Sequence, residues 1–527
     1  MNGAALARNS SSSVPHESMV NKTSLSEKLQ KNPLTYLLLF TVIYAIAEFC
    51  STFHRPFWID EIYTYELAEL PSIQQIWPLI KQGIELNPPL PFWTTWLIHH
   101  SVGKGEFFTR LPAVVGFWMM CICLFHFVRR RSDTLHAFIA LLLPVFTFTH
   151  SFATSARGYG LLLGFSAGAL LSWQYAKENR RRAVSLLCLT LCLAGALSCH
   201  YYALYVCGAL ALGEFVRTVD SKRVDVLLWI ALIAGSMSLV AYRSLLTTAG
   251  PAVHTFWIRA EPRFLYESYS DLFGSVTLVL LLLFSYVLRI HEGDRVSDWT
   301  PATLPRDEVA ACVTLAAMPL ALYVGSLFLP IPFYSRYVLP VVIGVTILSV
   351  LFLYRIGGNN AQFRRLVISL VVWVCLLPWT VWHITLFFIQ NPQRAVIAAT
   401  KINFDLEPSL PILVDNQSDF LSLYFYAPKS MRTRLFTLQD SDSAIKYLGS
   451  DTTDRSLRLL QGFRDFHVTS YQEFMSAHHD FLIARTKPEG WILQKLNADG
   501  AQIELISDQR DLGYFVPDSL LFRVKVR

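Results

Sequence analysis

The sequence is short of charge. Only 16% of its 527 residues are Asp, Glu, Lys or Arg, whereas 53% are hydrophobic. Soluble domains carry about 25% charged residues, so this deficit excludes an ordinary soluble protein. The apolar residues are also collected in long blocks, and the mean hydropathy is +0.38. This pattern predicts a polytopic membrane protein.

The C-terminal region lacks cysteine, and the whole sequence lacks the residue spacings that are typical of metal sites. None of the nine cysteines follows Cys375, so no disulfide framework is expected in the C-terminal region, and no CxxC or other zinc-ligand spacing occurs. A small-residue cleavage site is missing after the first apolar run, which follows a polar tail of about 30 residues. We therefore expect this run to span the membrane rather than to act as a signal peptide.

About eleven apolar segments are long enough to cross a bilayer, although several have only about 16–18 residues. They are residues 34–53, 107–128, 134–150, 158–176, 183–199, 201–216, 226–246, 271–290, 309–329, 337–354 and 366–389. The connecting loops are mostly short, so the sequence predicts an α-helical bundle in the membrane.

The basic residues of the short loops predict how these segments are threaded. Clusters such as Arg129–Arg131, Arg180–Arg182 and Lys222–Arg223 fall in alternate loops. Because positively charged loops stay in the cytoplasm, these loops and the N-terminus are expected there, and an odd number of spans places the C-terminus outside. Nucleic-acid binding is a second explanation for basic runs, but topology explains their alternation better. We therefore expect a cell (inner) membrane protein among membrane lipids, with no nucleic-acid partner.

Three regions are predicted along the chain. Residues 1–32 are rich in Ser and Asn and are expected to form a disordered cytoplasmic tail, and residues 33–391 contain the spans. In residues 392–527 short hydrophobic runs alternate with helical patterns, which predicts a small extracytoplasmic α/β domain. The expected strands are 411–414, 434–437, 466–469, 480–484, 502–506 and 520–526, and the expected helices are 441–448, 454–463, 471–478 and 489–497.

The first outer loop, residues 54–106, opens with two adjacent carboxylates, Asp60 and Glu61. Amphipathic stretches at 62–70 and 73–84 follow and fit a membrane interface. Acidic side chains at a membrane surface are unfavourable unless they are paired or functional. One of them could accept a proton as a general base, and an interfacial loop with solvated acids is the other explanation.

A second polar motif follows in the same loop. Glu85 and Asn87 precede Pro88–Pro89, which fix the chain in an extended form. This segment is either a rigid turn that re-enters the interface or a stiff mount that directs the two polar side chains at a substrate. Arg110 lies close behind and could neutralise a phosphate, because Arg forms bidentate pairs with phosphate oxygens. Lys104 is a second candidate for the phosphate.

Three further motifs place a cation or a titratable group at the same predicted membrane level. Each alone fits an interface anchor, because aromatic residues and Arg concentrate at headgroup depth. Together, on one face, they fit a pocket for an anionic lipid headgroup better. The residues concerned are Arg157 and Tyr159, then His200, Tyr201 and Tyr202, and finally Tyr334, Arg336 and Tyr337.

In order along the chain, these motifs resemble the glycosyltransferase C (GT-C) superfamily. The resemblance covers about residues 30–390 and is strongest to the branch with protein O-mannosyltransferases and lipid A aminoarabinose transferases. It rests on Asp60-Glu61, Asn87-Pro88-Pro89-Leu90, Arg110-Leu111-Pro112, Ala156-Arg157-Gly158-Tyr159, His200-Tyr201-Tyr202 and Arg336-Tyr337. It implies an α-helical polytopic membrane protein of GT-C type with about eleven transmembrane helices, and the C-terminal α/β domain lies outside it.

The resemblance also implies an activity, that of a hexosyl or pentosyl transferase. The donor would be a sugar on a polyprenyl phosphate, and the acceptor an unidentified lipid, glycan or protein of the cell envelope. The acidic pair Asp60 and Glu61 would be catalytic, with Asp60 as the base, Arg157 and Arg336 would hold the phosphate, and the reaction would invert the anomeric centre. Relatives often carry His before Pro-Pro, whereas this chain has Asn87. No metal or other cofactor is predicted, although metal dependence varies in the superfamily.

Two other functions are compatible with a membrane protein of this kind. A transporter or flippase for lipid-linked saccharides would need ionisable residues near the bilayer centre. Here Glu48, Glu214 and His383 lie near the ends of spans, which counts against transport. An envelope scaffold protein would use the C-terminal domain to bind a partner while the membrane part stays inert.

Overall fold

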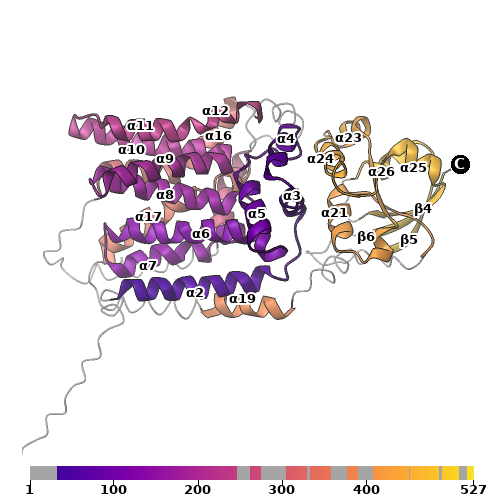
Figure 1. Cartoon of the computed structure of the whole chain (residues 1–527), viewed down its shortest axis with the longest axis horizontal. Helices are drawn as coiled ribbons and strands as arrows, with labels where there is room; N and C mark the ends of the chain where they lie inside the picture. Colours follow the sequence, from indigo (N-terminus) through magenta and orange to yellow (C-terminus); the bar gives the residue numbers. More distant parts are fainter. Residues whose placement is uncertain are drawn as a thin grey trace, which may run out of the picture.

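The computed structural model describes nine stretches of the chain. They are residues 32–245, 261–274, 304–328, 333–357, 377–389, 407–449, 451–485, 490–509 and 519–526. Figure 1 shows a bundle of long helices that lie side by side, and a smaller α/β domain beyond one end of the bundle. Short helices lie between these two parts.

The bundle consists of apolar helices that share one hydrophobic core. They are α2 (Pro33–Thr52), α6 (Glu106–Arg129), α7 (Thr134–Leu142), α8 (Tyr159–Lys177), α9 (Arg182–Cys199), α10 (Leu204–Ser221), α11 (Val226–Ser236), α12 (Ser238–Ala241), α15 (Arg306–Ala316), α16 (Met318–Phe328), α17 (Val341–Gly357) and α19 (Leu377–Ile389). Small residues let α6 and α8 approach closely: a Cβ on Gly160 would lie 2.2 Å from the carbonyl oxygen of Ala113. Such close contacts are common between membrane helices.

Within the described residues, four helices are long and apolar enough to cross a membrane, or five if α15 and α16, which meet at a bend of 58°, form one span. A multi-pass membrane protein is therefore confirmed. The expected count of about eleven spans stays a prediction. The predicted span 271–290 and the first part of 366–389 lie largely outside the described residues.

The predicted span 134–150 is interrupted. Helix α7 ends at Leu142, and two short 3₁₀ helices follow, η2 (Leu143–Phe146) and η3 (Phe148–Phe152). Pro144 explains the break, because proline lacks the N–H that an α-helix interior requires. The irregular backbone continues to Arg157, just before α8 begins.

Residues 54–106 form a group of short helices at the end of the bundle that faces the C-terminal domain (Figure 1). They are α3 (Ile59–Ala68), η1 (Ile73–Gln75), α4 (Ile76–Lys81) and α5 (Leu90–Ser101). The amphipathic stretch expected at 62–70 thus belongs to a helix that begins earlier. Helix α5 was not predicted; it starts directly after Pro88–Pro89, and its first turn contains Pro91, at a position where the missing N–H of proline costs no helical hydrogen bond.

The C-terminal domain, the described residues from 407 to 526, is built on a six-stranded sheet in the order β3-β2-β1-β4-β6-β5. Strands β1 to β4 are parallel, and β6 runs antiparallel to β4 and β5. The strands are β1 (Ile412–Val414), β2 (Leu435–Gln439), β3 (Val468–Ser470), β4 (Asp480–Arg485), β5 (Gln502–Gln509) and β6 (Ser519–Lys525). The helices are α21 (Gln417–Tyr426), α22 (Lys429–Arg432), α23 (Ser441–Leu448), α24 (Thr452–Gln461), α25 (Tyr471–Ala477) and α26 (Ile492–Ala498). The predicted α/β character is confirmed.

The C-terminal domain rests on α3. Apolar residues of α3 and α21 belong to one buried cluster, and Figure 1 shows α21 and α24 on the side that faces α3 and α4. The Tyr426 hydroxyl accepts a hydrogen bond from the Phe57 amide at 2.7 Å and lies 3.1 Å from Glu106 Oε1. Arg464 also forms an ion pair with Glu66 of α3. The helix that carries Asp60 is therefore fixed between the bundle and the domain.

Candidate active site

Arg157 joins two of the predicted acidic side chains. Its guanidinium forms a fork with Glu85, with Nη1 2.6 Å from Oε2 and Nη2 3.2 Å from Oε1. The Nε of the same group lies 3.8 Å from Asp60 Oδ2. Asp60 stands in the first turn of α3, and Arg157 stands just before α8. Two segments far apart in sequence thus bring a carboxylate and a cation together.

Glu85 is held in place by its own segment. It accepts hydrogen bonds from the Asn87 side chain at 2.8 Å and from the Leu86 amide at 3.0 Å. Burial raises the pKa of Glu85, but Arg157 and these donors outweigh burial, so the pKa is lowered overall. Burial likewise lowers the pKa of Arg157, and Glu85 and Asp60 raise it well above its ordinary value. Both groups are therefore charged at neutral pH.

Glu61 lies in a very different environment from its neighbour Asp60. The Asp60 side chain is 39% exposed, whereas that of Glu61 is 2% exposed. Glu61 accepts two hydrogen bonds from Arg110 and one from the Ala156 amide at 2.7 Å. Burial raises the pKa of Glu61, but Arg110 overcomes this and lowers it to about 2. Glu61 is thus a buried anchor next to the Arg157 segment.

The phosphate-binding role predicted for Arg110 does not fit this geometry. Its side chain is fully buried and forms five hydrogen bonds within the protein. Two go to Glu61, and three go to the carbonyl oxygens of Thr52, Arg55 and Pro56. An Arg side chain carries five N–H donors, so none is left for a phosphate.

Lys104 is also placed elsewhere. Its Nζ lies 2.7 Å from Glu69 Oε2, and the side chain is 53% exposed. His99 binds the other oxygen of Glu69 at 2.8 Å. Lys104 thus contacts a carboxylate at the far end of α3 rather than Asp60, Glu85 or Arg157, and its predicted role in phosphate binding stays a prediction.

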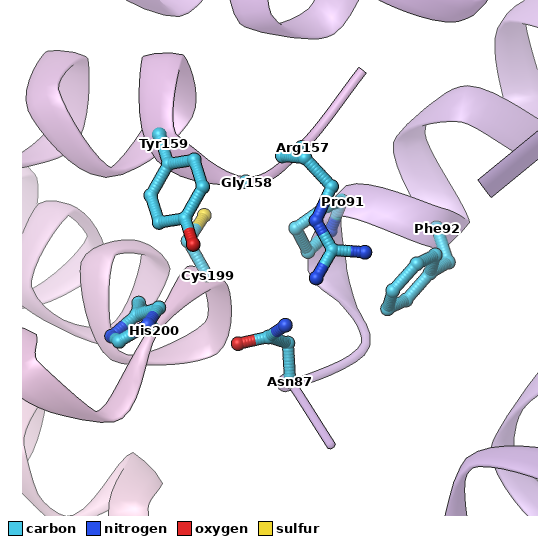
Figure 2. A pocket seen from close by; sticks show the side chains of 8 residues that line it. All are labelled: Asn87, Pro91, Phe92, Arg157, Gly158, Tyr159, Cys199 and His200. Atoms are coloured by element: carbon cyan, nitrogen blue, oxygen red, sulfur yellow. The ribbon is translucent and has the colours of Figure 1, made fainter. Parts of the chain in front are cut away.

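Beside Arg157 lies a small pocket (Figure 2), lined by Asn87, Pro91, Phe92, Arg157, Gly158, Tyr159, Cys199 and His200. The side chain of Asn87 and the Tyr159 hydroxyl point toward its centre. Its volume is about 10 Å³, which is the room for about one water molecule. Four side chains that the sequence motifs predicted to bind substrate or phosphate therefore meet at one place: Asn87, Arg157, Tyr159 and His200.

His200 is uncharged in this pocket. Burial and, to a smaller extent, the nearby cations Arg157 and Arg336 together lower its pKa to about 3. Its Nδ1 accepts a hydrogen bond from the Tyr202 amide at 3.3 Å. A neutral imidazole with Nδ1 as acceptor carries its proton on Nε2, so His200 can donate one hydrogen bond to a ligand.

Arg336 supplies a second cation, held by aromatic rings. Its guanidinium lies 4.9 Å from the ring centroid of Tyr334 and 5.4 Å from that of Tyr337. Tyr337 in turn stacks on Tyr202 with centroids 5.1 Å apart. Burial lowers the pKa of Arg336, and the oxygens of Tyr159, Tyr337 and Asp60 more than offset this effect. Within the described residues, Arg336 Nε is buried without a hydrogen-bond partner.

Tyr201 does not join this aromatic group. It packs against the buried cluster formed by the helices of residues 54–106 and the C-terminal domain. Of the three residues His200, Tyr201 and Tyr202, only the first and third contact Tyr337 in the described structure.

Arg55 was not predicted as a residue of the site, but it contacts two of its segments. Its Nη1 donates to the Thr154 hydroxyl at 2.8 Å, and its guanidinium lies 3.6 Å from Glu61. It therefore ties the end of α2 to the segment that carries Arg157. A cation at the end of the first span, five residues before Asp60, was the available signal.

Within the described residues, no group of three or more His, Cys, Asp or Glu side chains is arranged to hold a metal ion. The predicted independence of metal stays a prediction.

The arrangement can be compared with known proteins. No protein-family model matches the chain, and no curated protein matches it in sequence. Solved structures do match, and they define the class: the chain has the fold of the GT-C glycosyltransferases. The resemblance predicted from the sequence is thereby confirmed at the level of the fold.

One solved structure with this fold is that of ArnT from Cupriavidus metallidurans. Its apo structure matches with a TM-score of 0.57 and 14% identity, over 93% of this chain and 98% of that one. Its structure bound to undecaprenyl phosphate matches with a TM-score of 0.52 and 15% identity, over the same shares. An oligosaccharyltransferase from Archaeoglobus fulgidus matches with a TM-score of 0.46 and 10% identity, over 86% of this chain and 69% of that one.

Proposed function

We propose that this protein is a membrane glycosyltransferase that moves a sugar from a polyprenyl-phosphate donor to an acceptor outside the cytoplasm. The observation that carries the proposal is the position of Asp60, partly exposed and 3.8 Å from Arg157. A base for the acceptor and a cation for the leaving phosphate then stand side by side. ArnT, which has the same fold, binds undecaprenyl phosphate.

The two cations would act on the leaving group. As the sugar departs, negative charge grows on the phosphate. Arg157 and Arg336 are positioned before the reaction, by Glu85 and by Tyr334 and Tyr337. Preorganised charge of this kind stabilises the transition state more than the ground state.

Asp60 would remove the proton of the acceptor hydroxyl. The acceptor oxygen then forms a bond to the anomeric carbon, the bond from that carbon to the phosphate oxygen breaks, and the phosphate leaves with the electron pair. Attack opposite the leaving group inverts the anomeric centre. Glu61 takes no proton in this scheme, because Arg110 keeps it buried and charged.

Two roles follow for the other pocket residues. His200 would donate a hydrogen bond to the donor, because its Nε2 carries the proton. Tyr202 and Tyr337 would present ring faces at its side, and Asn87 and Tyr159 their polar groups. The pocket is small, so the donor must displace side chains as it enters.

The orientation is part of the proposal. Arg129 and Arg130, at the end of α6, lie opposite Glu106, which begins α6 and contacts the C-terminal domain. If the basic end faces the cytoplasm, then Asp60, Arg157 and the domain from about residue 392 face outward. Residues 33–391 would then form the catalytic membrane part.

The test uses the purified full chain in liposomes. A panel of polyprenyl phosphates with radiolabelled sugars is supplied, with crude cell envelope as acceptor. The proposal expects label to leave the lipid and to appear in the envelope fraction. Movement of intact labelled lipid across the bilayer without transfer would favour a transporter. Capture of an envelope partner with neither activity would favour a scaffold.

A further inference from the structure

A second, larger depression lies where the C-terminal domain meets the helices of residues 54–106. One wall is formed by the end of α3 and by α4, and the other by α24 and the residues after it. The volume of this groove is about 660 Å³, within the range of about 300–1,000 Å³ typical of ligand sites.

The groove lies in line with the proposed base. Along α3, Tyr63 is beside Asp454 and Ser456 of α24, Glu66 pairs with Arg464, and Glu69 lines the groove. From Asp60 to Glu69 the helix rises about 13 Å, at 1.5 Å per residue. A short oligosaccharide spans this distance.

The charged side chains of the groove include one cation, Arg458, that is available to bind an anionic group of a ligand. Glu69 is paired with Lys104 and His99, and Arg464 is paired with Glu66, so these charges are balanced. Arg458 is exposed, and its Nε donates to Gln439 at 3.1 Å. Over the described part of the chain Arg458 forms no ion pair. Its guanidinium therefore remains available to a carboxylate or phosphate.

The remaining lining suits a sugar chain better than a peptide or a lipid tail. Gln75 and Gln82 present exposed amides that can bond to hydroxyl groups, and Leu79, Leu459 and Phe463 provide half-buried apolar surface for the faces of sugar rings. The walls include helices, which satisfy most of their backbone groups internally, so they offer no strand edge for an extended peptide. Five of the twelve lining residues are polar or charged, and an acyl chain would bury their polar groups without hydrogen-bond partners.

We propose that the groove between α4 and α24 binds an acidic glycan portion of the acceptor, with Arg458 on its anionic group. This inference rests on the proposed function, but the groove can be tested without any transfer. The bound glycan would reach along α3 toward Asp60. The C-terminal domain would thereby select acceptors that carry an acidic sugar near the modified position.

The experiment measures binding to the purified full chain in detergent. The probe is a fluorescent hexasaccharide of galacturonate, and its methyl-esterified form is the neutral match. Three variants are compared. Arg458→Gln removes the cation, Gly462→Trp fills the groove at a position with ordinary backbone angles, and Arg455→Gln removes a charge from the same helix outside the groove.

The proposal expects the acidic probe to bind and the neutral probe to bind about tenfold more weakly, the loss typical of one charge-assisted hydrogen bond. Arg458→Gln should show the same loss, Gly462→Trp should abolish binding, and Arg455→Gln should leave it unchanged. Equal binding to wild type and Gly462→Trp, or no binding to wild type, would overturn the proposal. So would displacement by hexa-aspartate or dodecyl phosphate at lower concentrations than by unlabelled hexasaccharide. Because this binding assay contains no donor, a negative result would reject the groove as a glycan site without contradicting the proposed transferase activity.

Discussion

The guanidinium of Arg157 contacts Glu85 through both terminal nitrogens and leaves its Nε 3.8 Å from Asp60. Glu85 is itself bound by the segment before α5. The position of the cation relative to Asp60 is therefore set by a chain of contacts rather than by one flexible side chain. A phosphate that enters the pocket would meet an arginine already oriented.

Replacement of Arg157 by lysine tests whether the paired hydrogen bonds from Arg157 to Glu85 are needed for phosphate binding. Lysine keeps the charge but loses the planar pair of donors, so it cannot hold Glu85 and a phosphate in the same geometry. We expect affinity for undecaprenyl phosphate to fall about tenfold, the effect typical of one charged hydrogen bond. The measurement is binding of the lipid to the detergent-solubilised variant.

Arg455→Lys is the matched control, because Arg455 of α24 pairs with Asp451, the residue just before that helix. It should bind the lipid as wild type does. Unchanged affinity in Arg157→Lys would show that Arg157 does not hold the phosphate.

Substitution of the two adjacent carboxylates should affect different properties. Glu61→Gln should lower stability, and Asp60→Asn should abolish sugar transfer. Glu61→Gln leaves the buried Arg110 without its charged partner, which destabilises by about 3–5 kcal/mol in comparable pairs. Asp60→Asn changes a partly exposed group and should leave the unfolding temperature almost unaltered while transfer is lost. Thermal unfolding in detergent, measured beside sugar transfer, compares the two variants. Similar unfolding temperatures for both would contradict the anchor role of Glu61.

Acid should weaken the fold through His200. Its pKa is about 3 in the folded protein and about 6.5 when unfolded, so the unfolded chain binds the proton more tightly. The stabilisation is complete above about pH 6.5 and is lost as the pH falls toward 3, by about 1.4 kcal/mol per pH unit.

His200→Gln should therefore lose less stability than wild type between pH 6.5 and 4.5, measured as the unfolding temperature. The exposed His479 gives the control, His479→Gln. Parallel curves for wild type and His200→Gln would show that His200 is not held neutral.

Asp415 should have the opposite effect in the C-terminal domain. Burial raises its pKa to about 6, above about 3.9 in the unfolded chain, so its ionised form disfavours folding. That cost is absent below about pH 4 and reaches about 2–3 kcal/mol above pH 6. Asp415→Asn keeps the acceptor for the Leu493 amide and should raise the unfolding temperature at pH 7.5 but not at pH 4. Lower stability of the variant at pH 7.5 would contradict this account.

The pattern of hydrophobic residues predicted much of the secondary structure of the C-terminal domain. All six strands expected after residue 392 are present within a few residues of their predicted bounds, because each is a short apolar run between turn signals. Helix α21 was missed, since its sequence QSDFLSLYFY mixes aromatic and polar residues without a clear stripe. Pro144 was a sequence signal for the break after α7, but the hydropathy pattern alone predicted one continuous span over residues 134–150.

Four of the residues singled out in the sequence, Arg157, Glu85, Asn87 and His200, lie together in the structure, and their roles in the site stay predictions. The sequence could not show that the Arg110 side chain points inward to Glu61, because a buried arginine and a ligand-binding arginine are the same residue type in the sequence. Partner choice depends on side-chain direction, which only packing determines.

The most direct test of the account compares wild type with Asp60→Asn in liposomes that contain the labelled polyprenyl-phosphate sugar and an acceptor. Donor binding and sugar transfer are measured on the same preparation. The account predicts equal donor binding in both proteins, with transfer by wild type and its loss in Asp60→Asn. Equal transfer by the two proteins would contradict it, because Asp60 could not then be the base.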